Sequence, residues 1–169
     1  MNNKKLNKLI LMALMIAISF VGANIKLPGP FSTIAFDSFP AYFAGLLLGG
    51  VPGGVVGLLG HLMTSFLSGF PFGLPMHIVI GVMMFVSVYM FSVVTKRVNW
   101  IVGAIAGVVI NGIFMPIVLV LMPGFEWAMA MAFIPMLTAA SAANVTLAIV
   151  VNNAISKTEF VNGFSDDEL

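Results

Sequence analysis

The feature that most constrains this chain is a series of long apolar runs, separated by short segments rich in glycine and proline. Apolar runs of about 17 to 25 residues are long enough to cross a bilayer as helices. They are far longer than barrel strands and show no alternation of polar and apolar residues. The sequence therefore predicts an all-α integral membrane protein with six transmembrane helices, at about 7–24, 36–50, 52–68, 74–95, 99–122 and 128–153.

The composition indicates that lipid is the solvent of this surface. Only 8% of the 169 residues are charged, 60% are hydrophobic, and the mean hydropathy is +1.12. A soluble domain carries about a quarter charged residues, so this chain has too little charge to solvate a globule of its size. The net charge of +1 indicates no nucleic-acid partner, and the lack of cysteine excludes disulfides and thiolate ligands.

The six spans account for nearly the whole chain, which we treat as one membrane domain over residues 1–169. Its breaks carry turn residues, in segments such as "KLPGPFST", "GGVPGG" and "GFPFGLP". We expect an acidic, disordered tail over 160–169. The start, "MNNKKLNKLILMALMIAISFVGA", also has the basic and apolar regions of a secretory signal. Because the rest of the chain is polytopic, we favour its retention as the first span.

Basic residues predict the orientation of the spans. If both termini are cytoplasmic, Lys26 faces outward and the other six basic residues face inward, as the positive-inside rule requires. Those six are Lys4, Lys5, Lys8, Lys96, Arg97 and Lys157. The segments 24–36, 68–75 and 122–127 then lie outside.

Polar residues gather at the predicted outer ends of the spans. Charged and amide groups near hydrocarbon are costly and mark functional candidates, here Asn24, Asp37, His77 and Glu126. Aromatic residues occur on the same side, namely Phe36, Phe39, Phe70, Phe72, Phe125 and Trp127. We expect an outer binding site, with Asn24, Asp37, His77, Glu126, Phe36, Phe70, Phe72 and Trp127 as contacts. Alternatively, the carboxylates lie among solvated headgroups and the aromatic residues form an interfacial belt.

Three further polar residues fall deep within predicted spans. His61 lies near the middle of the third span, beside a face of small residues that permits close helix contact. Asn111 and Asn144 lie at similar depth in the fifth and sixth spans. Each is a candidate ligand contact, and each is explained equally well by hydrogen bonds between helices. With His77 at the mouth and His61 deeper, the stretch "GHLMTSFLSGFPFGLPMH" suggests one pocket wall.

Signatures of catalysis are missing from the sequence. It contains no G-x-S-x-G, no HExxH and no Walker A motif. Two histidines 16 residues apart, without cysteine, make a poor metal site. No polar pore stripe repeats over several spans. We therefore expect a non-enzymatic protein without cofactor or metal, which binds a solute from outside and lacks its own source of energy.

The chain resembles the S components of energy-coupling factor (ECF) vitamin transporters. Their first helix carries an A-x-x-x-A motif, which here is "ALMIA", from Ala13 to Ala17. The motifs Ala35-Phe36-Asp37, Gly60-His61 and Gly69-Phe70-Pro71 through His77 are most similar to S components for cobalamin precursors of the α-ribazole type. The chain lacks the Met-His start of nickel and cobalt S components, and begins Met-Asn-Asn-Lys-Lys instead.

This resemblance implies a location, partners and a mechanism. It implies a multi-pass protein of the bacterial cytoplasmic membrane that captures cobalamin or a precursor at its outer face. Ala13 and Ala17 would dock on a transmembrane coupling subunit, and two partner ATPases would drive toppling and release. Three alternatives stay open: an S component for another vitamin, a membrane enzyme that uses His61 or Asp37, and a structural assembly subunit.

Overall fold

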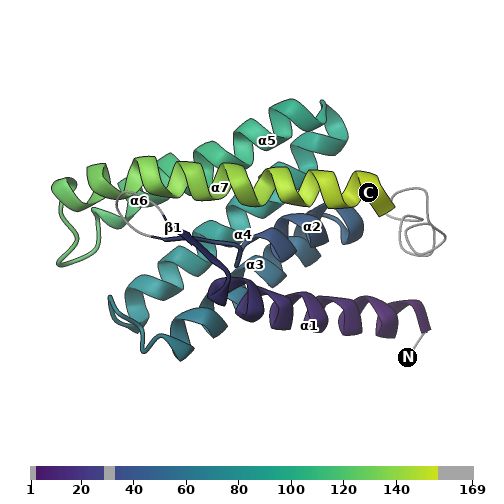
Figure 1. The fold of residues 1–169 in the computed structure, drawn as a ribbon, viewed down its shortest axis with the longest axis horizontal. Coiled ribbons are helices and arrows are strands. Elements are labelled where there is room, and N and C mark those ends of the chain that lie inside the picture. Colours follow the sequence, from purple (N-terminus) through teal and green to yellow (C-terminus); the bar gives the residue numbers. More distant parts are fainter. Residues whose placement is uncertain (1–2, 29–32, 156–169) are drawn as a thin grey trace.

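The computed structural model describes residues 3–28 and 33–155, which form a bundle of helices beside a short β-hairpin (Figure 1). The bundle opens with α1 (Asn3–Asn24) and the hairpin strands β1 (Lys26–Pro28) and β2 (Thr33–Ala35). The remaining elements are α2 (Phe39–Leu48), α3 (Gly50–Leu67), α4 (Leu74–Arg97), α5 (Trp100–Val109), the π-helix η1 (Ile110–Phe114), α6 (Met115–Leu119) and α7 (Trp127–Ile155).

The described residues include five helical segments that are long and apolar enough to cross a membrane. Their bounds are Lys4–Asn24, Gly50–Leu67, Leu74–Arg97, Trp100–Leu119 and Trp127–Ile155. The fourth segment comprises α5, η1 and α6, which follow one another without interruption. These five segments correspond to five of the six predicted spans and confirm a membrane-embedded, multi-pass helical protein. The predicted tail over 160–169 lies outside the described residues.

The second predicted span, 36–50, is shorter than expected. In its place α2 has ten residues, which at a rise of about 1.5 Å per residue give roughly half the thickness of a bilayer core. Pro40 lies at the start of α2, and Gly49 ends it with a φ of 98°, in a region that favours glycine. The prediction of six full-length spans is therefore not confirmed.

The hairpin before α2 is the second departure from the predicted all-helical fold. Its strands pair antiparallel, with Lys26 opposite Ala35 and Pro28 opposite Thr33. Each strand has three residues, too few to produce a recognisable alternating pattern. The hairpin uses up the residues that precede α2 and so explains why that helix starts late.

Small and polar side chains hold α2 between α3 and α4. A methyl group at Gly53 would lie 2.5 Å from the backbone of Gly45, so the α2–α3 contact requires glycine there. The Tyr42 hydroxyl lies 2.8 Å from Ser87 Oγ, which donates to the carbonyl of Gly107 at 2.9 Å. These bonds connect α2, α4 and α5 in a region where water is scarce.

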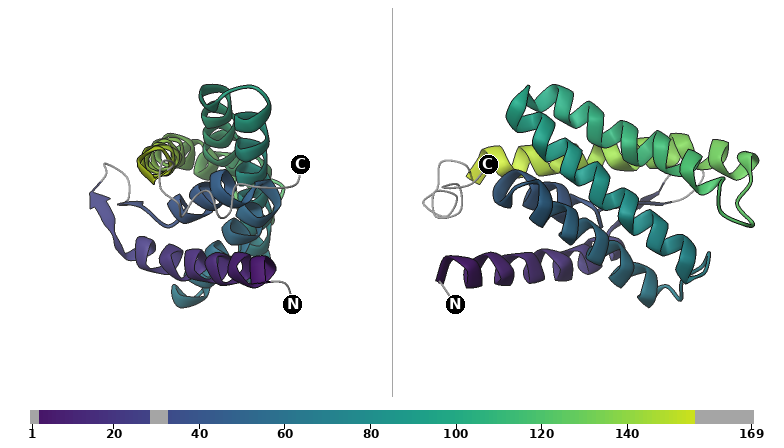
Figure 2. Two further views of the ribbon diagram at one scale, coloured as in Figure 1. Left: turned by 90° about the vertical axis from the view of Figure 1, so that its right-hand side faces the viewer. Right: turned by 180° about the vertical axis from the view of Figure 1, so that it is seen from behind.

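The outside of the bundle is apolar, and its two ends differ. Large side chains such as Phe66, Leu121 and Met131 are more than half exposed, as expected for a surface that faces lipid. The start of α1 and the end of α7 lie at the same end of the molecule (Figures 1 and 2). The connections from α3 to α4 and from α6 to α7 lie toward the opposite end.

Candidate functional site

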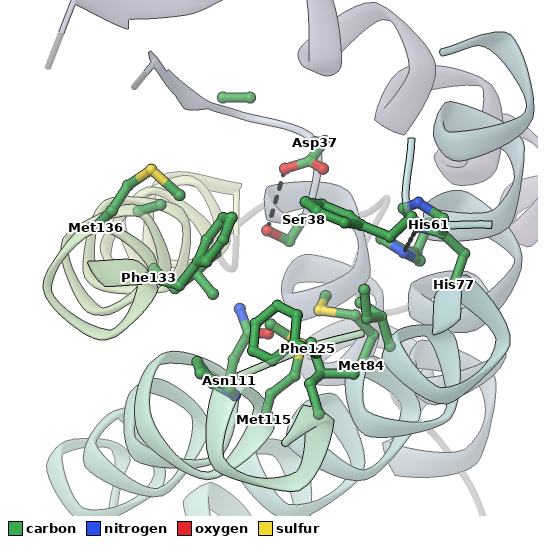
Figure 3. Close-up of a pocket in the computed structure, with 17 residues that line it drawn as sticks. Asp37, Ser38, His61, His77, Met84, Asn111, Met115, Phe125, Phe133 and Met136 are labelled. Carbon is green, nitrogen blue, oxygen red and sulfur yellow. Dashed lines mark hydrogen bonds between the residues drawn. The ribbon is translucent and has the colours of Figure 1, made fainter. Parts of the chain in front are cut away.

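A cavity of about 270 Å³ lies toward the end of the bundle that is opposite the start of α1 and the end of α7. Figure 3 shows the residues that line it. Its walls come from the segment before α2 and from α3, α4, η1, α6 and α7. The lining residues are Ala35, Asp37, Ser38, His61, Phe72, His77, Ile80, Met84, Asn111, Met115, Pro116, Leu119, Phe125, Phe133, Met136, Leu137 and Ala140. A mostly apolar chamber with a few polar groups is typical of a small-molecule site.

The two histidines of the chain meet in the wall of this cavity. His61 Nε2 lies 3.1 Å from His77 Nδ1, although the residues belong to different helices. Ser65 Oγ lies 3.2 Å from His61 Nε2 and 3.0 Å from His77 Nδ1, and so completes a cluster of three. His77 is buried, and its Nε2 hydrogen-bonds to no atom of the described chain. That nitrogen is available to a ligand.

Aromatic rings pack beside His77. The loop after α3 places the Phe72 ring centroid 6.2 Å from that of His77. Phe72 also packs edge-on against Phe125 at 6.3 Å and Phe133 at 6.1 Å. The loop is held by the positive φ angles of Gly69, Phe70 and Gly73. These rings form a surface on which a planar ligand can pack.

Asp37 lies in the segment between β2 and α2 and turns toward the cavity (Figure 3). Ser38 Oγ donates to its Oδ1 over a long 3.4 Å. Asp37 therefore gains from a ligand that donates hydrogen bonds to it.

Asn144 fixes the segment that carries Asp37 but does not line the cavity. Its Oδ1 accepts from the Phe39 N–H at 2.6 Å, and its Nδ2 donates to the Ala35 carbonyl at 2.9 Å. Nδ2 also donates to the carbonyl of Ala140 at 2.8 Å. Of the two roles left open for Asn144, these contacts favour the structural one.

Asn111 lies on the π-helix η1, which joins α5 and α6 within the fifth predicted span. Its Nδ2 donates to Ser141 Oγ at 2.6 Å and so connects η1 with α7. Its Oδ1 is buried, and no donor of the described residues reaches it. Because Asn111 also lines the cavity, it combines a helix contact with an acceptor available to a ligand. π-Helical turns often occur at functional sites.

The remaining predicted contacts do not line the cavity. Asn24 is exposed, and its Nδ2 donates to the carbonyl of Phe20 in the preceding turn. Glu126 and Trp127 are exposed at the start of α7. Phe36 and Phe70 are both half-buried and do not line the cavity. The Phe70 ring lies 5.6 Å from that of His77. The structure therefore brings together five of the predicted residues: Asp37, His61, Phe72, His77 and Asn111.

Several residues that line the cavity were not singled out in the sequence analysis. Ser38, Phe133 and the methionines Met84, Met115 and Met136 belong to the lining. The apolar ones are of the same types as residues that face lipid, so composition alone does not distinguish them. Phe125 gave a signal, since it is one of the aromatic residues grouped on the outer side, and it is buried beside Phe133.

Within residues 3–28 and 33–155, no three residues of the types histidine, cysteine, aspartate and glutamate lie close enough together to hold a metal ion. The predicted docking residues lie elsewhere, because Ala13 and Ala17 are both exposed on α1.

The fold and cavity define a multi-pass helical membrane protein with an internal chamber suited to a small molecule. The sequence matches the family described as "ECF transporter, substrate-specific component" over residues 7–157. The chain therefore belongs to the family of ECF transporter substrate-specific (S) components. These proteins are substrate-binding transport subunits and not enzymes themselves.

Two solved structures are similar to this chain in fold. The S component described in "Structure and mechanism of the S component of a bacterial ECF transporter" is 23% identical, with a TM-score of 0.69, over 90% of this chain and 96% of its own. ThiT from Listeria monocytogenes is 20% identical, with a TM-score of 0.67, over 94% and 98% of the two chains. No curated protein sequence matches the chain.

Proposed function

We propose that this S component captures a cobalamin precursor of the α-ribazole type, a nucleoside-sized molecule with a planar base. The observation that carries the proposal is the cavity itself. Its lining combines the aromatic rings of Phe72 and Phe133 with polar groups of Asp37, His77 and Asn111. A planar base packs on the rings, and ribose hydroxyls donate to the carboxylate.

The size of the cavity supports a precursor rather than cobalamin itself. Its volume of about 270 Å³ equals roughly nine water molecules at about 30 Å³ each. This volume suits a nucleoside, whereas an intact corrinoid is several times larger. Between the two ligands suggested by the sequence, the cavity therefore supports the smaller.

The proposed orientation in the membrane places both ends of the chain in the cytoplasm. The start of α1 and the end of α7 lie at one end of the bundle, which supports this arrangement (Figure 1). In it, α2 and the segment before it cross together as the second of six transmembrane segments. The cavity then lies toward the outer side of the bacterial cytoplasmic membrane.

Energy for transport would come from partners, since ECF S components work with a membrane coupling subunit and ATPases. Ala13 and Ala17 are exposed one turn apart on α1, and such a face of small residues permits close contact with another helix.

We expect Ala17→Leu to abolish uptake and to leave ligand binding unchanged. As a control, Ala142→Leu, at an exposed alanine of α7, is expected to affect neither.

The proposal is tested by mass spectrometry of small molecules that co-purify with the detergent-solubilised chain expressed alone. One α-ribazole per chain is the expected result. Another vitamin would identify a different substrate branch. No ligand after growth in rich medium, and no binding across a panel of vitamins, would contradict the proposal and favour a structural subunit.

A further inference from the structure

The hydrogen-bonding character of the cavity depends on one proton of the histidine pair. His61 Nε2 and His77 Nδ1 face each other at 3.1 Å, so only one of the two carries the hydrogen between them. If His61 donates, neutral His77 carries its proton on Nε2 and is a donor to the cavity. If His77 donates, its Nε2 presents a lone pair. Ser65 fits both arrangements, because a hydroxyl both donates and accepts.

A second, smaller cavity borders both His61 and Asp37. It has a volume of about 20 Å³ and its polar lining consists of Ser19, Asp37, Ser38 and His61. About 10–15 Å³ is enough for one water molecule, and a buried water requires two to four polar partners. His61 Nε2 hydrogen-bonds to His77 Nδ1. Nδ1 is therefore the His61 ring nitrogen that is available to this small cavity.

We propose that a water in the small cavity connects the Asp37 carboxylate to His61 Nδ1, and that this connection makes His77 a hydrogen-bond acceptor. The water donates a hydrogen bond to the carboxylate and accepts one from His61 Nδ1–H. His61 Nε2 is then unprotonated and accepts from His77 Nδ1–H. His77 Nε2 therefore turns a lone pair toward the main cavity.

The consequence is a cavity in which the buried polar atoms without a partner among the described residues accept hydrogen bonds. Asp37 is an acceptor, Asn111 Oδ1 lies buried without a donor among the described residues, and His77 Nε2 becomes the third. Of the lining residues that the structure describes, none is lysine or arginine. The cavity thus selects neutral ligands rich in O–H and N–H donors and rejects carboxylates and phosphates. This inference rests on the proposed function, because it defines the chemistry of the same ligand.

Nitrogen NMR of the ligand-free protein tests the tautomers without any substrate. The chain has only two histidines, so a sample labelled with ¹⁵N-histidine in nanodiscs gives only their four ring nitrogens. We expect both rings to be neutral and protonated at Nδ1. In Asp37→Ala this preference is expected to be lost, whereas Ser38→Ala retains it. A His77 ring protonated at Nε2 in the wild type would overturn the inference.

Binding of a matched pair of ligands tests the selectivity. The probes are α-ribazole and α-ribazole 5′-phosphate, which differ by one anionic group. We expect the phosphate to bind weaker by on the order of 100-fold or more, because no basic side chain compensates its charge. Equal or tighter binding of the phosphate would overturn the selectivity and leave the proposed function intact. Binding of neither probe would contradict the α-ribazole assignment, while the NMR result alone decides the tautomers.

Discussion

Asn144 on α7 holds the backbone at the start of α2, accepting a hydrogen bond from the Phe39 N–H at 2.6 Å. The same side chain donates to the carbonyl of Ala35, four residues earlier in the chain. Asp37 lies between these two anchor points. One buried amide therefore determines where a carboxylate enters the cavity, and links the last helix of the bundle to the candidate site.

Replacement of Asn144 by alanine is expected to destabilise the protein by about 1–3 kcal/mol, because it leaves buried backbone groups without partners. For a chain of this size, the melting temperature should fall by about 2–4 °C per kcal/mol. Thermal unfolding in detergent measures the change. Asn24→Ala is the matched control, because Asn24 is exposed and bonds only within its own helix. If both variants melt alike, Asn144 does not have this anchoring role.

The approach of α2 to α3 gives a second prediction. Gly53→Ala places a methyl group 2.5 Å from the Gly45 backbone, and such overpacking costs about 1–3 kcal/mol. Gly81→Ala is the control, since a methyl there meets its nearest neighbour, the Leu58 carbonyl oxygen, at an ordinary 3.5 Å. We expect Gly53→Ala to melt lower and Gly81→Ala to melt at or above the wild-type temperature. The reverse order would show that these helices do not pack as described.

The fold was predictable from the sequence to the extent that hydrophobic length determines it. The long runs predict α1, α3, α4 and α7, together with the interrupted fifth span. The shortness of α2 was not predictable, because residues 36–38 are as compatible with a helix end as with the bend that they form.

The candidate site was predictable where polar residues are rare. Asp37, His61, His77 and Asn111 stood out against an apolar chain, and all four line the cavity. Glu126 stood out equally but is exposed, since a residue at a span end can face either solvent or the interior. The contact between the two histidines depends on how α3 and α4 cross, and residue spacing does not specify that crossing.

The Asp37 carboxylate is expected to contribute strongly to ligand affinity. Hydrogen bonds to a charged acceptor contribute about 1.5–3 kcal/mol, so Asp37→Asn should weaken α-ribazole binding by about 10- to 100-fold. Isothermal titration in detergent measures this change. Glu126→Gln is the matched control, because Glu126 is an exposed carboxylate outside the lining. A loss of affinity in Glu126→Gln comparable to that in Asp37→Asn would relocate the site.

Phe133 is expected to be one of the aromatic contacts of the ligand. Its ring turns into the cavity from α7 (Figure 3). Phe133→Ala should lower affinity by about tenfold, as aromatic pairs contribute roughly 0.5–1.5 kcal/mol beyond the burial of their area. Phe66→Ala serves as control, because Phe66 is 66% exposed on the surface that we assign to lipid. Unchanged affinity in Phe133→Ala would exclude stacking on this wall.

The most direct test of the account is a calorimetric titration of the purified chain, alone in detergent, with α-ribazole. The account predicts saturable binding of one molecule per chain, and competition by neutral molecules of similar shape. It also predicts that binding requires neither a coupling subunit nor ATP. Absence of binding, or binding that Asp37→Asn and Phe133→Ala leave unchanged, would contradict the claim that this cavity is the substrate site.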